Sequence, residues 1–162
     1  MPSRTWGGSG IAGASVRGSV VAMEAARGQV VSLRCAVMPQ APARILVAED
    51  EASVAQQVIN RFTVLGHDVH WAKAVREVRA ELPAFEPDVL ILDATLDTDG
   101  LELFQAIRFA PEHPRAGVVI LTAAGDVGAR ERAQQLGAAA VMMKPVRHDE
   151  LVEIVEDLLT YI

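Results

Sequence analysis

The chain has 162 residues, of which 51% are hydrophobic, 15 are basic and 21 are acidic, and it contains a single cysteine. A chain of this length can build a core without disulfides or metal ions, and its positive mean hydropathy excludes disorder throughout. One cysteine excludes a disulfide-stapled secreted scaffold and favours a cytoplasmic, reducing environment, while the formal net charge of −6 argues against non-specific binding to nucleic acid. The sequence also lacks an uninterrupted apolar run long enough to span a membrane.

Residues 1–43 differ in composition from the rest of the chain. They contain four arginines, one acidic residue and half of the 12 glycines, and they show no sustained strand or helix periodicity. We predict a disordered extension ahead of a folded domain at 44–162. Its arginine-rich, acid-poor composition is that of an organelle transit peptide, which is one interpretation. We favour the other, in which 1–37 is dispensable, as in an over-extended start with Met38 as the alternative first residue.

From residue 44 onward, short apolar runs alternate with segments of helical periodicity. In chain order the sequence predicts a strand at 45–48, a helix at 54–65 ended by Gly66, a strand at 69–71, a helix at 74–82 stopped by Pro83, a strand at 88–92, a helix between Gly100 and Pro111, a strand at 118–121, a helix at 127–136 ended by Gly137, a strand at 140–143 and a helix at 149–159. Strands that are apolar throughout, rather than alternating, indicate a parallel sheet covered on both faces. The predicted fold is therefore α/β: a doubly wound five-stranded parallel sheet with helices on both faces.

Polar residues directly follow four of the five predicted strands. They are Glu49 and Asp50 after the first strand, Asp93 after the third, Thr122 after the fourth and Lys144 after the fifth. The carboxyl ends of parallel strands lie at one edge of the sheet, so we expect these side chains to converge. Carboxylates that share a pocket repel each other unless a cation lies among them, and oxygen ligands of this kind suit Mg²⁺. Together with the ammonium and the hydroxyl, they suit an incoming phosphoryl group.

The distribution of lysine and histidine bears on which of these residues belong to the expected site. Lys144 is one of two lysines among the 15 basic residues, so a lysine directly before Pro145 indicates that a compact ammonium group is required there. The four histidines lack metal-ligand spacing and are expected on the surface or in loops: His67, His70, His113 and His148.

The whole of 44–162 resembles the receiver domain of two-component response regulators, a family with a flavodoxin-like fold. Four segments carry the resemblance, and their signature positions occur in the family's order. These are 45–51, similar to the first strand with its acidic pair; 88–93, similar to the strand with the phospho-accepting aspartate; 118–123, similar to the switch-threonine strand; and Lys144-Pro145, similar to the lysine with its cis proline.

The resemblance implies that Asp93 accepts a phosphoryl group from a sensor histidine kinase or a histidine phosphotransfer protein. Asp50, Asp93 and the backbone carbonyl of Thr95 would bind Mg²⁺, with Glu49 assisting through water. Lys144 would neutralise charge on the phosphoryl oxygens during transfer.

The resemblance also implies a switch surface. Thr122 would be drawn toward the phosphoryl group, which would shift the face formed by the fourth helix, the fifth strand and the fifth helix. Val141 stands where the family usually has an aromatic switch residue, so signalling is expected to rely on Thr122 and on backbone shifts. Arg130 and Arg132, on the fourth helix, are candidate contacts for a partner.

Two further positions depart from the family pattern. After Asp93 the family usually has a proline and a longer turn, whereas residues 96–100 contain no proline and are one residue short. This loop borders the expected site, so it bears on kinase recognition and on phosphoryl lifetime. Glu49 stands where aspartate is more frequent, and its longer side chain bears on the distance to a metal ion.

The sequence ends three residues after Leu159, so we expect a stand-alone signalling protein rather than an enzyme. It would act by binding a downstream protein target, without direct contact to nucleic acid or membrane, and its final helix could support a phosphorylation-dependent dimer. Two alternatives remain. One is a receiver-fold binding module that acts without phosphorylation. The other is a Mg²⁺-dependent hydrolase of the haloacid dehalogenase type, which would require an aspartate where Thr95 stands.

Overall fold

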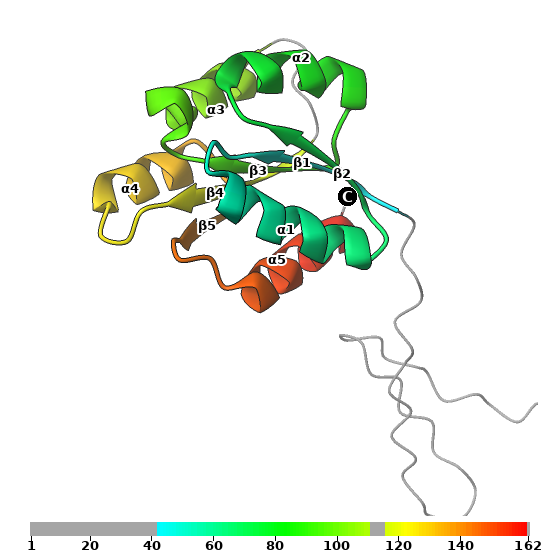
Figure 1. The fold of residues 1–162 in the computed structure, drawn as a ribbon. Helices are drawn as coiled ribbons and strands as arrows, with labels where there is room; N and C mark the ends of the chain where they lie inside the picture. The colour runs from blue at the N-terminus through cyan, green and yellow to red at the C-terminus, as the bar shows by residue number, and fades with distance from the viewer. Residues whose placement is uncertain (1–41, 111–115, 162) are drawn as a thin grey trace, which may run out of the picture. The chain divides into compact units, whose positions relative to one another are not determined.

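The computed structural model describes residues 42–110 and 116–161, which belong to a unit spanning Ala41–Ile162. Residues 1–41 of the predicted extension and His113 lie outside the described residues. The strands form one parallel sheet in the order β2-β1-β3-β4-β5 (Figure 1). They are β1 (Arg44–Ala48), β2 (Asp68–Ala72), β3 (Val89–Asp93), β4 (Gly117–Thr122) and β5 (Ala140–Met143). The five predicted strands and their parallel pairing are confirmed.

Five helices cover the two faces of this sheet, as the sequence predicts. They are α1 (Ala52–Val64), α2 (Val75–Phe85), α3 (Gly100–Phe109), α4 (Val127–Gln135) and α5 (His148–Thr160), and a short 3₁₀ turn, η1 (Leu96–Thr98), precedes α3. One apolar cluster joins a face of the sheet to α1 and α5, and a second joins the other face to α2, α3 and α4 (Figure 1). Successive residues of β1 and β3 alternate between the two clusters, which explains why these strands are apolar throughout.

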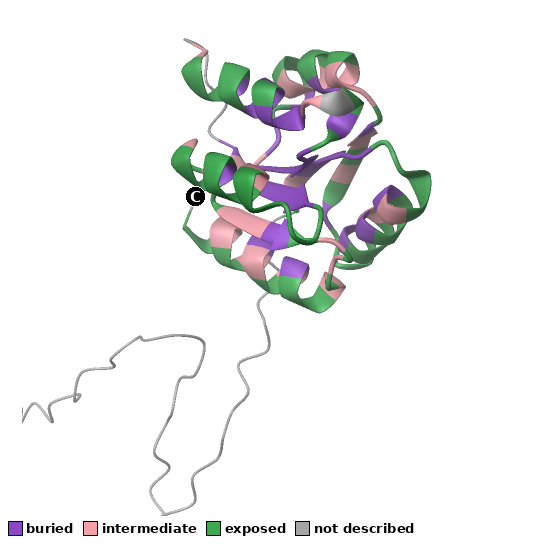
Figure 2. Cartoon of the chain, turned by 90° about the vertical axis from the view of Figure 1, so that its left-hand side faces the viewer, coloured by how far each residue is buried: buried purple, intermediate pink, exposed green. Residues whose placement is uncertain are grey.

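Figure 2 shows buried residues along the sheet and exposed residues on the outer sides of the helices. Because both faces are filled by apolar side chains, the central strands β1, β3 and β4 carry polar side chains only at their ends. Among the described residues, no helix combines the length and the apolar character needed to cross a membrane.

The helix α2 differs from the prediction, because it continues through Pro83 to Phe85. Pro83 lies in the last turn, where its missing N–H removes one intrahelical hydrogen bond. Phe85 offsets this loss: it is buried, and its ring stacks on that of His70 with a centroid distance of 3.8 Å. The helix ends instead at Glu86, which adopts a left-handed conformation with φ of 46°.

His67 lies in the loop after α1, which agrees with the predicted surface or loop position, but its side chain is buried. Its Nδ1 lies 3.3 Å from the backbone N of Ala43 and its Nε2 lies 2.9 Å from Oε1 of Glu156 on α5. A backbone N–H can only donate, so Nδ1 is the acceptor, and Nε2 of the neutral ring carries the proton that Glu156 accepts. His67 therefore joins the start of β1 to α5.

We predict that His67→Phe lowers the free energy of unfolding by about 1–3 kcal/mol, because the buried Ala43 N–H loses its acceptor while the aromatic bulk is kept. Urea denaturation followed by circular dichroism measures the change. Glu156→Gln keeps an acceptor for Nε2–H and serves as the control, with a much smaller loss expected. Equal losses in the two variants would contradict a special role for the Ala43 contact.

Candidate functional site

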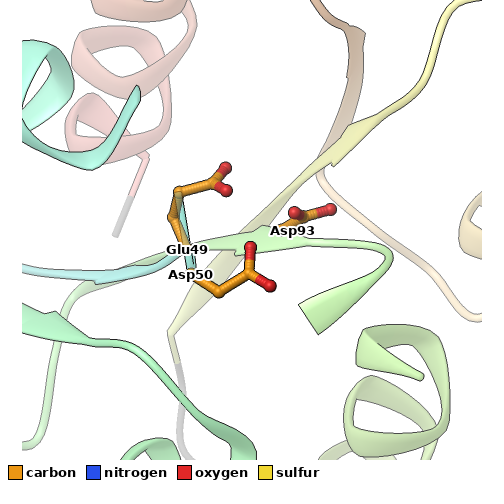
Figure 3. Close-up of side chains that lie close together, drawn as sticks. All are labelled: Glu49, Asp50 and Asp93. Carbon is orange, nitrogen blue, oxygen red and sulfur yellow. The ribbon is translucent and has the colours of Figure 1, made fainter. Parts of the chain in front are cut away.

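Three carboxylates meet at the carboxyl edge of the sheet. Glu49 and Asp50 follow β1, Asp93 ends β3, and one oxygen from each lies within 4.8 Å of the others (Figure 3). The parallel register of β1 and β3 pairs Ala48 with Leu92, so the next residue of each strand is necessarily a neighbour of the other. Glu49 and Asp93 are 1% and 3% exposed, whereas Asp50 is exposed. The expected convergence of acids from distant parts of the chain therefore occurs.

Lys144 places one positive charge between the two buried carboxylates. Its Nζ lies 2.8 Å from Oε2 of Glu49 and 2.9 Å from Oδ2 of Asp93. Its backbone N–H donates to the carbonyl of Thr122, and the following peptide bond to Pro145 is cis. The ammonium group is anchored at the end of β5 and bridges the ends of β1 and β3.

The electrostatics of this trio follow from burial and from the shared ammonium. Burial raises the pKa of Asp93, but hydrogen bonds from Lys144 and Thr95 outweigh it, so the pKa lies below its ordinary value. Burial, reinforced by the negative charge of Asp93, raises the pKa of Glu49 above its ordinary value despite the contact with Lys144. Burial lowers the pKa of Lys144, yet the hydrogen bonds to both carboxylates raise it overall. Asp93 is therefore an ionised carboxylate facing a charged lysine.

The loop after β3 fixes the orientation of Asp93. The backbone N–H and the hydroxyl of Thr95 both donate to Oδ1 of Asp93, at 2.8 and 2.9 Å, which leaves Oδ2 to Lys144. Gly100 begins α3 directly against this strand end. A Cβ at Gly100 would lie 2.0 Å from the backbone oxygen of Asp93, so only glycine fits there without a shift of the backbone. This close approach holds the start of α3 beside the site.

Thr122, at the end of β4, carries a hydroxyl that is buried and has no hydrogen-bond partner among the described residues. A buried hydroxyl without a partner is costly, and such groups are rare in folded proteins. Thr122 therefore offers a donor to an additional oxygen-bearing group at this edge of the sheet.

The donor set fits a hard divalent cation. Three carboxylates face a single ammonium group, which leaves excess negative charge in a partly buried place. The side chain of Asp50 makes no hydrogen bond or ion pair within the part of the chain that the structure describes. Glu49 is more fully engaged, since Oε1 accepts from the Glu51 N–H at 3.1 Å and Oε2 faces Lys144. Carboxylate oxygens at such spacing are the ligands that hard cations prefer.

The remaining residues singled out in the sequence lie away from this cluster. Val141 is half-buried and packs against the apolar cluster under α2, α3 and α4. Arg130 and Arg132 are exposed on α4, and Arg132 donates to the side chain of Gln105 on α3 at 3.0 Å.

Trp71 is a site neighbour that sequence reasoning missed. Its indole N–H donates to the backbone oxygen of Glu49 at 2.8 Å. The sequence signal was an aromatic residue near the end of β2, but its meaning depends on the sheet order that places β2 beside β1.

Comparison with known proteins agrees with this geometry. The family model described as "Response regulator receiver domain" matches residues 45–156. The transcriptional regulatory protein TrcR of Mycobacterium tuberculosis is 34% identical over 119 residues, covering 73% of this chain and 46% of TrcR. The transcriptional regulatory protein GlrR of Escherichia coli is 31% identical over 123 residues, covering 75% of this chain and 27% of GlrR. The chain thus spans about a quarter to a half of the length of the curated relatives it matches.

A solved structure supports the fold. The response regulator receiver domain protein (CheY-like) from Methanospirillum hungatei superimposes with a TM-score of 0.67 at 23% identity, covering 75% of this chain and 96% of that one.

We predict that Lys144→Met lowers the free energy of unfolding by about 3 kcal/mol at neutral pH, because two buried carboxylates lose their shared cation. Urea denaturation measures the change. Lys73→Met, at the other lysine of the chain, is the matched control; its ammonium lies over the ring of Trp71, and its loss is expected to cost less than about 1 kcal/mol.

The deficit of Lys144→Met should depend on pH. In the wild type, the lowered pKa of Asp93 contributes stability that is complete above the ordinary aspartate pKa and is lost as the pH falls through the lowered value. Without Lys144, its hydrogen bonds and charge no longer oppose burial, so the pKa of Asp93 and that of Glu49 lie higher than in the wild type and the folded variant binds protons at higher pH. The difference in unfolding free energy is therefore expected to be largest near neutral pH and to shrink on acidification. A difference in unfolding free energy that does not change with pH would show that Lys144 stabilises the fold by a means other than its charge interaction with the two carboxylates.

Proposed function

Because the chain belongs to the response regulator receiver family, we propose that Asp93 accepts a phosphoryl group from a histidine of a sensor kinase or a phosphotransfer protein. The observation that carries the proposal is the ionised Asp93 carboxylate, oriented by Thr95 and flanked by Lys144 and two further acids. We also propose the division of the chain into an extension at 1–43 and the receiver domain at 44–162.

In the proposed reaction Asp93 is the nucleophile. A carboxylate oxygen of Asp93 forms a bond to phosphorus while the bond between phosphorus and the donor's imidazole nitrogen breaks, which gives an acyl phosphate and a neutral histidine. The hydrogen bonds from Thr95 hold the attacking group in one orientation, and the Lys144 ammonium neutralises charge on the transferred group.

We propose Mg²⁺ as the cation of this site, held by Asp50, Asp93 and the backbone carbonyl of Thr95, with Glu49 assisting through water. Bound Mg²⁺ would supply positive charge to the phosphoryl oxygens. The exposed carboxylate of Asp50 and the excess of acids over ammonium groups support this assignment. The contact of Glu49 with Lys144 adds a second function for this acid, since it holds the ammonium group in place before transfer.

The surroundings of the site suggest how the donor approaches and how the signal leaves. A hollow of about 450 Å³ is lined by Lys144 and by residues of α1, of the loops after β4 and β5 and of α5, and we propose that a donor side chain approaches the site from this side. The unpaired hydroxyl of Thr122 would donate to a phosphoryl oxygen, and the response would pass to α4, β5 and α5. Val141 and the exposed Arg130 and Arg132 lie on these elements, where we place the contact with a downstream protein.

We predict that incubation of the wild type with acetyl phosphate and Mg²⁺ adds one phosphoryl group, as seen by intact-protein mass spectrometry, and that Asp93→Asn abolishes the addition. Asp126→Asn replaces an aspartate that caps α4 and serves as the control, with normal phosphorylation expected. Continuous release of phosphate without an accumulating adduct would indicate the hydrolase alternative. Absence of any adduct in the wild type would indicate a phosphorylation-independent binding module.

We predict that Asp50→Asn raises the Mg²⁺ concentration needed for half-maximal phosphorylation by about tenfold or more, because a charged ligand is lost. The rate of adduct formation is measured across a Mg²⁺ titration, with EDTA as the metal-free reference. Asp157→Asn, an exposed carboxylate on α5, controls for the loss of one negative charge. An unchanged Mg²⁺ requirement in Asp50→Asn would contradict its assignment as a ligand.

A further inference from the structure

The turn that carries Glu49 and Asp50 and the loop that follows Asp93 both make hydrogen bonds to one short segment that carries none of the site's acids. This segment, residues 71–75, runs from the end of β2 through the connection to the first residue of α2. It lies beside β1, because β2 is the edge strand next to β1 in the sheet. Its contacts run to the backbone of Glu49 and to the side chain of Asp97.

Trp71 and Ala72 hold the backbone of Glu49 on both sides. The N–H of Glu49 donates to the Ala72 carbonyl at 3.1 Å, and the carbonyl of Glu49 accepts from the Trp71 indole at 2.8 Å. That carbonyl belongs to the peptide bond that leads into Asp50, so the indole fixes the direction in which the chain turns toward this acid. The ammonium of Lys73 lies 4.3 Å from the ring centroid of Trp71, which favours the observed placement of the half-buried ring.

Asp97 fixes the second loop to the same segment. Its Oδ2 accepts the backbone N–H of Val75, the first residue of α2, at 2.7 Å. Asp97 has a φ of 49°, a left-handed conformation that is uncommon for residues other than glycine but is adopted more readily by Asp and Asn than by most. It follows the fully buried Leu96 and lies two residues after Thr95, in the stretch that has no proline. The bond to α2 gives this stretch a fixed anchor.

We propose that Trp71 and Asp97 are positioning residues for the phosphoryl-accepting site and act through the connection at 71–75. Together they hold the Glu49–Asp50 turn and the loop at 94–99 in a fixed relation. The carboxylates then stand at cation-binding separation before the cation arrives, and less conformational entropy is lost when it binds. This inference rests on the proposed function of Asp93.

The test compares Mn²⁺ affinities of the full chain, measured by water-proton relaxation. Trp71→Phe removes the indole N–H and keeps an aromatic ring, and Asp97→Ala removes the acceptor for Val75. Each is expected to weaken Mn²⁺ binding by about fivefold, the effect of losing one hydrogen bond that holds a loop. The matched control for the first is Tyr161→Phe, which likewise removes a side-chain donor and keeps an aromatic ring, at an exposed position after α5, with unchanged affinity expected.

Comparison of Asp97→Asn with Asp97→Ala separates the loss of charge from the loss of the hydrogen-bond acceptor. Asp97→Asn removes the same negative charge but keeps an acceptor oxygen and tolerance for the left-handed conformation, so it is expected to restore affinity to within about twofold of the wild type. Urea unfolding establishes that each variant is folded. If Trp71→Phe does not fold, the comparison of Asp97→Ala with Asp97→Asn is sufficient to test the positioning role.

Two results would overturn the inference: wild-type Mn²⁺ affinity in both Trp71→Phe and Asp97→Ala, or equal weakening in Asp97→Asn and Asp97→Ala, which would assign the effect to charge. Phosphorylation of wild-type Asp93 by acetyl phosphate is measured in parallel. Its absence would count against the proposed function, whereas normal phosphorylation with unaltered Mn²⁺ affinity in the variants would remove only the positioning role.

Discussion

The ammonium of Lys144, held between the buried carboxylates of Glu49 and Asp93, is the interaction on which the rest of the site depends. Removing two carboxylates from water costs several kcal/mol each by the usual order of magnitude, and one lysine compensates only part of that cost. Because Asp50 adds a third negative charge within 4.8 Å, the edge of the sheet retains an attraction for a further cation. The excess negative charge that the fold tolerates at this edge is therefore also the property that attracts a cation.

The fold explains why this imbalance occurs at a strand end. The central strands β1, β3 and β4 are covered on both faces by α1 and α5 and by α2, α3 and α4, so their polar groups are restricted to their ends. Parallel pairing brings the ends of β1, β3, β4 and β5 to the same edge. Residues that are up to 95 positions apart, from Glu49 to Lys144, then become neighbours without any contribution from local sequence.

Sequence reasoning succeeded where local pattern determines structure. The strands and the positions of Asp93 and Thr122 follow from apolar runs and the residues that end them. It failed where a distant contact decides: α2 passes Pro83 because Phe85 packs on His70 of another element, and His67 is buried because α5 returns to cover it. The hydrogen bonds from residues 71–75 to both loops could not be predicted for the same reason, since each joins segments that are about 22 residues apart in the sequence.

In the proposed switch, which lacks the aromatic ring usual in the family, the unpaired hydroxyl of Thr122 would supply the free energy. A buried hydroxyl without a partner is worse by about 1–3 kcal/mol than one that donates a hydrogen bond. In the proposed phosphorylated state, an oxygen of the acyl phosphate becomes its acceptor. Within this proposal, the gain would correspond to a shift of roughly 5- to 150-fold between two conformations of the α4–β5–α5 face. Val141 is half-buried and packs against the core, so in the proposed switch β5 would move as part of the packed sheet.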